Sequence, residues 1–158
     1  MKELLKKIKK NKEIVGIFGL GYVGLPLALN FNKKKIKVFG FDIDDSKINY
    51  LKKGKSYLSH IKSNEISIAK KNGFIPTKNF SLAKYLDVII ICVPTPLTKT
   101  KQPNLTYVLN TMKSISNYLR PGQIISLEST TYPGTTKEIL LPIIEKKKLN
   151  IGKNFFLS

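Results

Sequence analysis

A glycine-spaced turn between two apolar segments constrains the fold of this chain more than any other feature. Segment 19–24 carries glycine in the spacing G-x-G-x-x-G, an apolar run at 14–18 precedes it, and residues 25–29 contain no charged side chain. A buried strand, a tight turn and a buried helix are expected in that order. The helix N-terminus then presents free N–H groups and the positive end of its dipole, which suit the pyrophosphate of a dinucleotide.

Each of the three glycines has its own physical reason. Gly19 permits a turn that a side chain would strain, and Gly24 lets the new helix pack closely against the strand. Gly21 lets the backbone approach a phosphate group. The alternative is that these glycines only form a tight strand–helix connection and bind no ligand.

An acidic residue closes the second predicted strand. Asp42 lies 18 residues after Gly24, close to the spacing of about 20 residues at which a carboxylate holds the adenine ribose. Its negative charge would repel a 2′-phosphate, which favours NAD over NADP. Lys47 could partly offset that repulsion, or it could be a solvated lysine. Asp42 could also cap the helix that follows.

Helical and strand-like periods alternate along the chain, which is typical of an α/β protein with a parallel sheet. We predict a Rossmann-type doubly wound sheet of about six strands, the last truncated at Ser158. Pro142 is expected to kink or interrupt the last helix. The predicted strands are 14–18, 36–41, 74–77, 87–93, 123–127 and 154–157, and the predicted helices are 22–33, 46–53, 61–72, 105–119 and 135–147, with a helical turn at 81–85.

The length of 158 residues suggests one domain, residues 1–158, that begins with a short amphipathic helix at 1–11. Leu4, Leu5 and Ile8 are expected on its apolar face. This stretch lacks the apolar core of a signal peptide, and no segment approaches the roughly 20 apolar residues of a membrane span, so no membrane partner is expected. A single cysteine, Cys92, excludes an internal disulfide and fits a reducing cytoplasm.

The net charge of +18 raises the question of a nucleic-acid partner. Arg120 is the only arginine, whereas nucleic-acid surfaces favour arginine for bidentate and stacking contacts. The lysines are also scattered over the chain. We therefore expect solvated lysine faces and no nucleic-acid partner, with a modest attraction for an anionic nucleotide left open. No metal site is expected, because His60 and the single cysteine have no clear carboxylate cluster beside them.

Three motifs occur in order along the chain: Gly19-Leu-Gly-Tyr-Val-Gly-Leu-Pro26, Cys92-Val-Pro-Thr-Pro-Leu97 and Glu128-Ser-Thr-Thr-Tyr-Pro-Gly-Thr-Thr136. Together they resemble the UDP-glucose/GDP-mannose dehydrogenases. The third motif, with Gly54-Lys-Ser-Tyr57 upstream, is most similar to the bacterial UDP-N-acetylhexosamine 6-dehydrogenases. The resemblance implies NAD-dependent oxidation of the C6 hydroxyl of a UDP-N-acetylhexosamine or UDP-hexose to a carboxylate, with a cysteine that captures the aldehyde.

The same resemblance implies roles for individual residues. Thr130 would help to position the reacting oxygen or water. The implied cofactor-binding residues are Gly19, Leu20, Gly21, Tyr22, Val23 and Gly24 at the pyrophosphate, Asp42 and Lys47 at the ribose, and Val93, Pro94, Thr95, Ser129 and Thr131 near the nicotinamide. Thr95 could instead belong to a rigid turn, and Ser129 and Thr130 could cap the helix near Thr135.

The resemblance also implies parts that this chain does not contain. In the family, the catalytic cysteine, lysine, asparagine and aspartate lie in later central and C-terminal substrate domains, which also build most of the dimer. We therefore expect an inactive fragment, with a homo-oligomer possible only when those domains are present. Cys92 is not the expected nucleophile, because it lies in an apolar strand. Glu128 and His60 are expected to be structural or surface residues. A β-hydroxyacid-type dehydrogenase domain and a non-catalytic nucleotide-binding remnant remain as alternatives.

Overall fold

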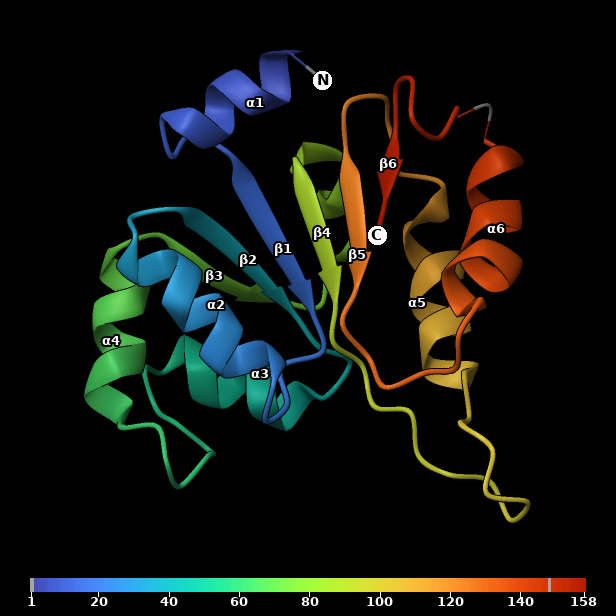
Figure 1. Cartoon of the computed structure of the whole chain (residues 1–158). Helices are drawn as coiled ribbons and strands as arrows, with labels where there is room; N and C mark the ends of the chain where they lie inside the picture. Colours follow the sequence, from blue (N-terminus) through green and yellow to red (C-terminus); the bar gives the residue numbers. More distant parts are fainter. Residues whose placement is uncertain (1, 148) are drawn as a thin grey trace.

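The computed structural model describes residues 2–147 and 149–158 and shows one parallel sheet with helices on both faces (Figure 1). The strand order is β3-β2-β1-β4-β5-β6, which is the order of a doubly wound dinucleotide-binding sheet. The predicted fold class is therefore confirmed. The strands are β1 (Ile14–Phe18), β2 (Lys37–Phe41), β3 (Phe74–Thr77), β4 (Val88–Ile91), β5 (Ile124–Leu127) and β6 (Phe156–Leu157).

The helices fall into two groups about the sheet (Figure 1). One group, α2, α3 and α4, packs with β1, β2 and β3, and the other, α5 and α6, covers the opposite face. The helical segments are α1 (Lys2–Lys9), α2 (Gly24–Lys33), α3 (Asp45–Lys52), α4 (Ser63–Lys71), the 3₁₀ helix η1 (Phe80–Tyr85), α5 (Thr106–Ser116), the π-helical turn η2 (Thr136–Leu140) and α6 (Leu141–Glu145).

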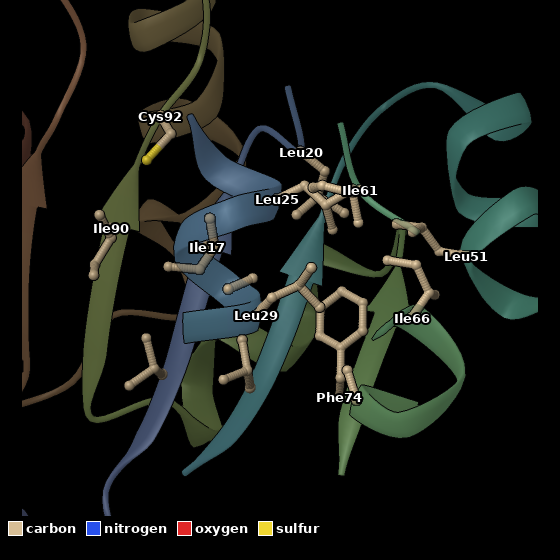
Figure 2. Packing of buried hydrophobic residues seen from close by; sticks show 14 of the residues in the cluster. Ile17, Leu20, Leu25, Leu29, Leu51, Ile61, Ile66, Phe74, Ile90 and Cys92 are labelled. Atoms are coloured by element: carbon tan, nitrogen blue, oxygen red, sulfur yellow. The ribbon is translucent and has the colours of Figure 1, made fainter. Parts of the chain in front are cut away.

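Side-chain alternation along the strands creates two apolar cores, one on each face of the sheet. In and just after β4, Ile90 and Cys92 join the core beneath α2, whereas Ile89 and Ile91 join the core beneath α5. This is the period-2 pattern of a strand buried on both sides. Figure 2 shows the first core, in which Leu20, from the turn after β1, packs among residues of α2, α4 and the sheet.

The strand order creates a crevice at the carboxyl ends of β1 and β4. The chain leaves β1 toward β2 on one side, whereas β4 pairs with β1 on the other side and continues toward β5. Ligands of open α/β sheets bind where such connections diverge. The turn after β1 and the segment after β4 also meet directly here, because the Cys92 N–H donates to the Phe18 carbonyl at 2.7 Å.

The last predicted helix, 135–147, consists of two parts. A π-helical turn, η2, is followed by α6, and Pro142 stands in the first turn of α6. A proline has no N–H to donate, and the first turn of a helix does not need one. Pro142 was expected to kink or interrupt the helix, but the chain stays helical through it: Leu140 and Leu141 keep α-helical backbone angles, and only the hydrogen bonding changes from π to α just before the proline.

The short amphipathic helix predicted at 1–11 is present as α1, and Leu4, Leu5 and Ile8, at positions i, i+1 and i+4, share one side of it. Leu4 is buried, but Leu5 and Ile8 are 48% and 38% exposed. The helix lies at the amino-end edge of the sheet, where a charged contact also attaches it: Lys7 Nζ lies 2.8 Å from Asp87 Oδ1.

Asp87 is the centre of a polar network at this amino end. Its carboxylate accepts hydrogen bonds from Lys7, from the Ile14 N–H at 3.0 Å and from Arg120 at 3.1 Å. Burial would raise the pKa of Asp87, but these three hydrogen bonds outweigh it and hold the pKa below its usual value. The only arginine of the chain thus serves a structural ion pair.

In the part of the chain that the structure describes, no helix has the length and apolar character needed to cross a membrane.

Candidate dinucleotide site

A cavity of about 730 Å³ opens at the carboxyl ends of β1, β2, β4 and β5. The structure places eleven of the predicted site residues on its wall, although they come from four separate segments, which follow β1, β2, β4 and β5; Lys47 lies in the first turn of α3. These residues are Gly19, Gly21, Tyr22, Val23, Asp42, Lys47, Val93, Pro94, Thr95, Ser129 and Thr130.

Three predicted residues do not line this cavity. The Leu20 side chain is fully buried in the core under α2, and Gly24 is buried at the start of the helix. Thr131 lies one residue beyond the wall formed by Ser129 and Thr130. Leu20 and Gly24 therefore pack the turn against the core and do not form part of the cavity wall.

The three glycines of the turn meet different surroundings. Gly19 has a φ of +93°, and a Cβ there would lie 2.7 Å from the Cys92 carbonyl oxygen. A Cβ at Gly24 would lie 1.8 Å from the Gly19 carbonyl oxygen. At Gly21, by contrast, an added Cβ meets nothing within 4 Å. Packing therefore requires Gly19 and Gly24, whereas Gly21 leaves open space on the cavity wall.

Asp42 joins the end of β2 to the glycine turn. One carboxylate oxygen accepts the Leu20 N–H at 2.9 Å and the Lys47 ammonium at 3.3 Å, and the other accepts the Asp44 N–H at 3.0 Å. The alternative that Asp42 caps the next helix is not what the structure shows. Asp44 is the N-cap of α3, where its carboxylate accepts the Ser46 N–H at 2.8 Å.

Hydroxyl groups fix the loops after β4 and β5 to each other. Thr95 Oγ1 donates to the Thr130 carbonyl at 2.6 Å, and Ser129 Oγ donates to the Val93 carbonyl at 2.7 Å. Ser129 therefore does not cap the helix near Thr135, since its hydroxyl bonds to the segment after β4. These bonds hold Thr130 at the cavity edge.

Sequence reasoning missed the aromatic floor of the cavity. Phe18 and Phe41 lie in register on β1 and β2, and their rings stack with centroids 4.2 Å apart. Phe80 packs at a tilt against both rings. The register of two adjacent parallel strands was the signal, because it pairs the last residue of β1 with the last residue of β2.

A polar stripe of α5 also lines the cavity and was not predicted. Its members recur at positions i, i+3, i+4 and i+7 of the helix, a spacing that marks one helix face. They are Tyr107, Asn110, Thr111 and Ser114.

Cys92 and Glu128 lie on the cavity wall as well. Burial, with a smaller contribution from the Glu128 charge, raises the pKa of the Cys92 thiol to about 11. Such a thiol is protonated at neutral pH and is a poor nucleophile, in agreement with the expectation from sequence. Glu128 is exposed, and its carboxylate accepts a hydrogen bond from Ser126 Oγ at 2.6 Å.

His60, expected to be a surface or packing residue, is exposed and stacks on Tyr22, with ring centroids 5.8 Å apart. Among residues 2–147 and 149–158, no group of three or more His, Cys, Asp or Glu side chains is arranged to hold a metal ion.

The cavity as a whole offers a ligand the N–H groups of the glycine turn, the Asp42 carboxylate and an apolar floor. This set suits an elongated ligand with a phosphate centre, hydroxyl groups and a flat ring.

Residues 13–157 match the model of the UDP-glucose/GDP-mannose dehydrogenase family, NAD binding domain. The chain is 40% identical over 143 residues to a UDP-N-acetyl-D-glucosamine 6-dehydrogenase of Pseudomonas aeruginosa, a match that covers 90% of this chain and 33% of that protein. It is 39% identical over 145 residues to Protein CapL of Staphylococcus aureus, covering 91% of this chain and 33% of that protein. The chain thus spans about a third of the length of these relatives.

Solved structures agree with these matches. The UDP-N-acetyl-mannosamine dehydrogenase Cap5O from S. aureus superposes with a TM-score of 0.85 at 28% sequence identity. The superposition covers 91% of this chain and 35% of the Cap5O chain.

Proposed function

Because this chain belongs to the UDP-glucose/GDP-mannose dehydrogenase family and is its NAD-binding domain, we propose that it serves the oxidation of a nucleotide sugar at C6. The proposed substrate is a UDP-N-acetylhexosamine, because the P. aeruginosa relative is a UDP-N-acetyl-D-glucosamine 6-dehydrogenase and Cap5O is a UDP-N-acetyl-mannosamine dehydrogenase. When bound, NAD⁺ supplies the hydride acceptor. The chain's own residues bind it, orient it and hold its surroundings in place.

One observation carries the proposal: the open space at Gly21. Packing does not require glycine there, yet Gly21 lies on the wall of the cavity, beside the N-terminus of α2. The first N–H groups of a helix have no partner inside the helix, so they remain available to an anion. A pyrophosphate beside Gly21 makes use of both the space and these donors. The residues present therefore fit the cofactor.

Asp42 is proposed to hold the adenine ribose. Its carboxylate is only 8% exposed but lies on the cavity wall, and it can accept hydrogen bonds from the ribose hydroxyl groups. A 2′-phosphate would bring a second negative charge to this carboxylate. Lys47 neutralises part of the charge, at 3.3 Å, so the preference for NAD⁺ over NADP⁺ is expected to be clear but not absolute.

The nicotinamide half is proposed to lie beside the loops after β4 and β5. Val93, Pro94, Thr95 and Ser129 form that part of the wall, and Thr131 follows it. Thr130 is proposed to position the reacting oxygen or water, because its backbone is held by Thr95 and it stands exposed at the edge. The single, poorly ionised thiol supplies no nucleophile here, so covalent chemistry is assigned to parts of the enzyme beyond this domain.

The expected setting is a reducing cytoplasm, where one free thiol is stable. Residues beyond this domain are proposed to complete the sugar site and any dimer. The 158-residue chain alone is therefore expected to bind NAD⁺ and not to turn over a UDP-sugar, because it spans only about a third of its relatives.

Calorimetric titration of the purified chain with NAD⁺ and NADP⁺ tests the cofactor assignment. Saturable binding of NAD⁺, tighter than that of NADP⁺, is the expected result. A folded chain that binds neither nucleotide contradicts the proposal. Absorbance at 340 nm with NAD⁺ and UDP-N-acetylglucosamine tests turnover, and appearance of NADH with the chain alone would show that the reaction needs no further domain.

A further inference from the structure

The connection between α3 and α4, residues 53–62, contacts the glycine turn at two points. The Tyr57 hydroxyl donates a hydrogen bond to the Leu20 carbonyl, and the His60 ring stacks on the Tyr22 ring, 5.8 Å between centroids. We propose that this connection, through Tyr57 and His60 together, positions the glycine turn for the pyrophosphate. The inference rests on the proposed cofactor site and adds a residue to it, since Tyr57 is not on the cavity wall.

Tyr57 acts on a peptide group whose other end faces the site. The Leu20 carbonyl and the Gly21 N–H belong to the same peptide unit, and no cis peptide bond is found among the described residues. In a trans peptide the C=O and the N–H point in opposite directions. When Tyr57 holds the Leu20 carbonyl on the core side, the Gly21 N–H is directed away from that core. Gly21 is the residue that leaves open space on the cavity wall.

Leu20 is held from its other side as well. Its N–H donates to Asp42 at 2.9 Å, so the two peptide groups that flank Leu20 are bound by two different segments. Its side chain is fully buried. Figure 2 shows Leu20 beside Leu25 and Ile61, residues of one core cluster. The turn is thus fixed before any ligand arrives, a form of preorganisation that lowers the cost of binding.

The Tyr57 hydroxyl is a dependable donor. Burial, followed by the charges of Asp42 and Asp44, raises the pKa of Tyr57 above its usual value. The phenol therefore keeps its proton over the whole physiological pH range. A deprotonated tyrosine could only accept, and the Leu20 carbonyl offers no proton.

The connection is itself tied to α4. Ser67 Oγ donates to the Gly54 carbonyl at 3.1 Å, and the Ser56 N–H donates to Ser63 Oγ at 3.1 Å. Leu58 and Ile61 are buried in the same core as Leu20. Tyr57 therefore stands on a fixed support, which allows its hydroxyl to set the orientation of the turn.

The variant Tyr57→Phe removes only the hydroxyl. We expect the Kd for NAD⁺ to rise about three- to tenfold, the effect of losing one neutral hydrogen bond, while the Kd for adenosine changes less than about twofold. Adenosine has the ribose but no phosphate, so it does not depend on the glycine turn, whereas a general loss of structure would weaken both ligands equally. Tyr50→Phe, at an exposed tyrosine away from the cavity, is the matched control and should leave both Kd values unchanged.

The outcomes separate the two proposals. If the wild-type chain does not bind NAD⁺, the proposed function fails and this inference fails with it. If the wild-type chain binds NAD⁺ and Tyr57→Phe binds it equally well, or loses NAD⁺ and adenosine by the same factor, only the role of Tyr57 is overturned. Should Tyr57→Phe lose its wild-type circular dichroism, His60→Ala, a change at the exposed second contact, decides: weaker NAD⁺ binding with unchanged adenosine binding supports the positioning role of the connection, and unchanged NAD⁺ binding overturns it.

Discussion

Gly24 and Gly19 touch so closely that a methyl group at Gly24 would lie 1.8 Å from the Gly19 carbonyl oxygen. The contact joins the first residue of α2 to the residue that follows β1. Two glycines of the same motif therefore serve the packing of the turn, while the one between them faces open space.

Because of this difference, a methyl group added at Gly24 tests the stability of the chain, whereas a methyl group added at Gly21 tests its binding of NAD⁺. Gly24→Ala is expected to destabilise the chain by about 1–3 kcal/mol or more, because the backbone must move to relieve the overlap. Gly21→Ala is expected to keep its stability within about 0.5 kcal/mol but to lose most NAD⁺ affinity, because its Cβ enters the space assigned to the pyrophosphate. Urea unfolding and NAD⁺ titration of both variants make the comparison. Wild-type affinity in Gly21→Ala would contradict the assigned position of the pyrophosphate.

The charge at Asp42 is expected to set the choice of nucleotide. Asp42→Asn keeps the side-chain shape but removes the negative charge, so NAD⁺ should bind about tenfold more weakly, as for one charged hydrogen bond. NADP⁺ should lose less, because the repulsion of its 2′-phosphate disappears. Lys47→Met should act in the opposite sense and increase the preference for NAD⁺. An unchanged ratio of the two Kd values in both variants would place the ribose elsewhere.

Removal of the Asp87 charge is expected to destabilise the sheet without affecting the cofactor. Asp87→Asn disrupts charged hydrogen bonds to Lys7 and Arg120, worth about 1.5–3 kcal/mol, at the end of the sheet opposite to the cavity. Asp45→Asn is the matched control, because the exposed Asp45–Lys78 pair should contribute about 0–1 kcal/mol. Urea unfolding measures both. A loss of NAD⁺ affinity in Asp87→Asn would mean that the two ends of the sheet are coupled.

The same carboxylate gives a pH dependence whose sign is fixed. The pKa of Asp87 is lower in the folded chain than its usual value, so its contribution to stability is complete above about pH 4, the value of an unfolded aspartate. The contribution is lost as the pH falls through the folded pKa. The difference in stability between wild type and Asp87→Asn should therefore shrink on acidification below pH 4, and a difference that grows instead would be inconsistent with the network.

The thiol of Cys92 is expected to react slowly. Because its pKa is raised to about 11, the alkylation rate with iodoacetamide should increase about tenfold per pH unit from pH 7.5 to 9.5 without levelling off. An ordinary cysteine, with a pKa of about 8.5, would level off in that range. NAD⁺ should slow the reaction further, since Cys92 lines the cavity. A plateau near pH 8.5 would show that the thiol is not buried as described.

Most of the fold follows from local pattern. A strand buried on both faces needs an uninterrupted apolar run such as 87–93, and the glycine spacing at 19–24 leaves few alternatives to a strand–turn–helix unit. Strand order is then restricted by the handedness of parallel connections. The ends of elements were less well predicted: β4 is the shorter segment Val88–Ile91, because the chain turns toward the cavity after it.

The site was predictable only where a motif marks it. Phe41 precedes Asp42, and its place on the cavity floor could have been predicted from the register of β1 and β2. The hydrogen bond between Tyr57 and Leu20 could not, because it joins residues 37 positions apart and no repeating pattern in the sequence indicates it. Asp42 and Asp44 are equally good helix caps by residue type, and only the backbone geometry assigns the cap to Asp44.

The contact of Gly19 with the segment after β4 has a consequence for the order of assembly. The residue that a Cβ at Gly19 would strike is Cys92, far downstream in the chain. During synthesis, Asp42 and Tyr57, which hold the two peptide groups that flank Leu20, emerge before β4. The contact of Gly19 with the segment after β4, by contrast, can form only once β4 has been made.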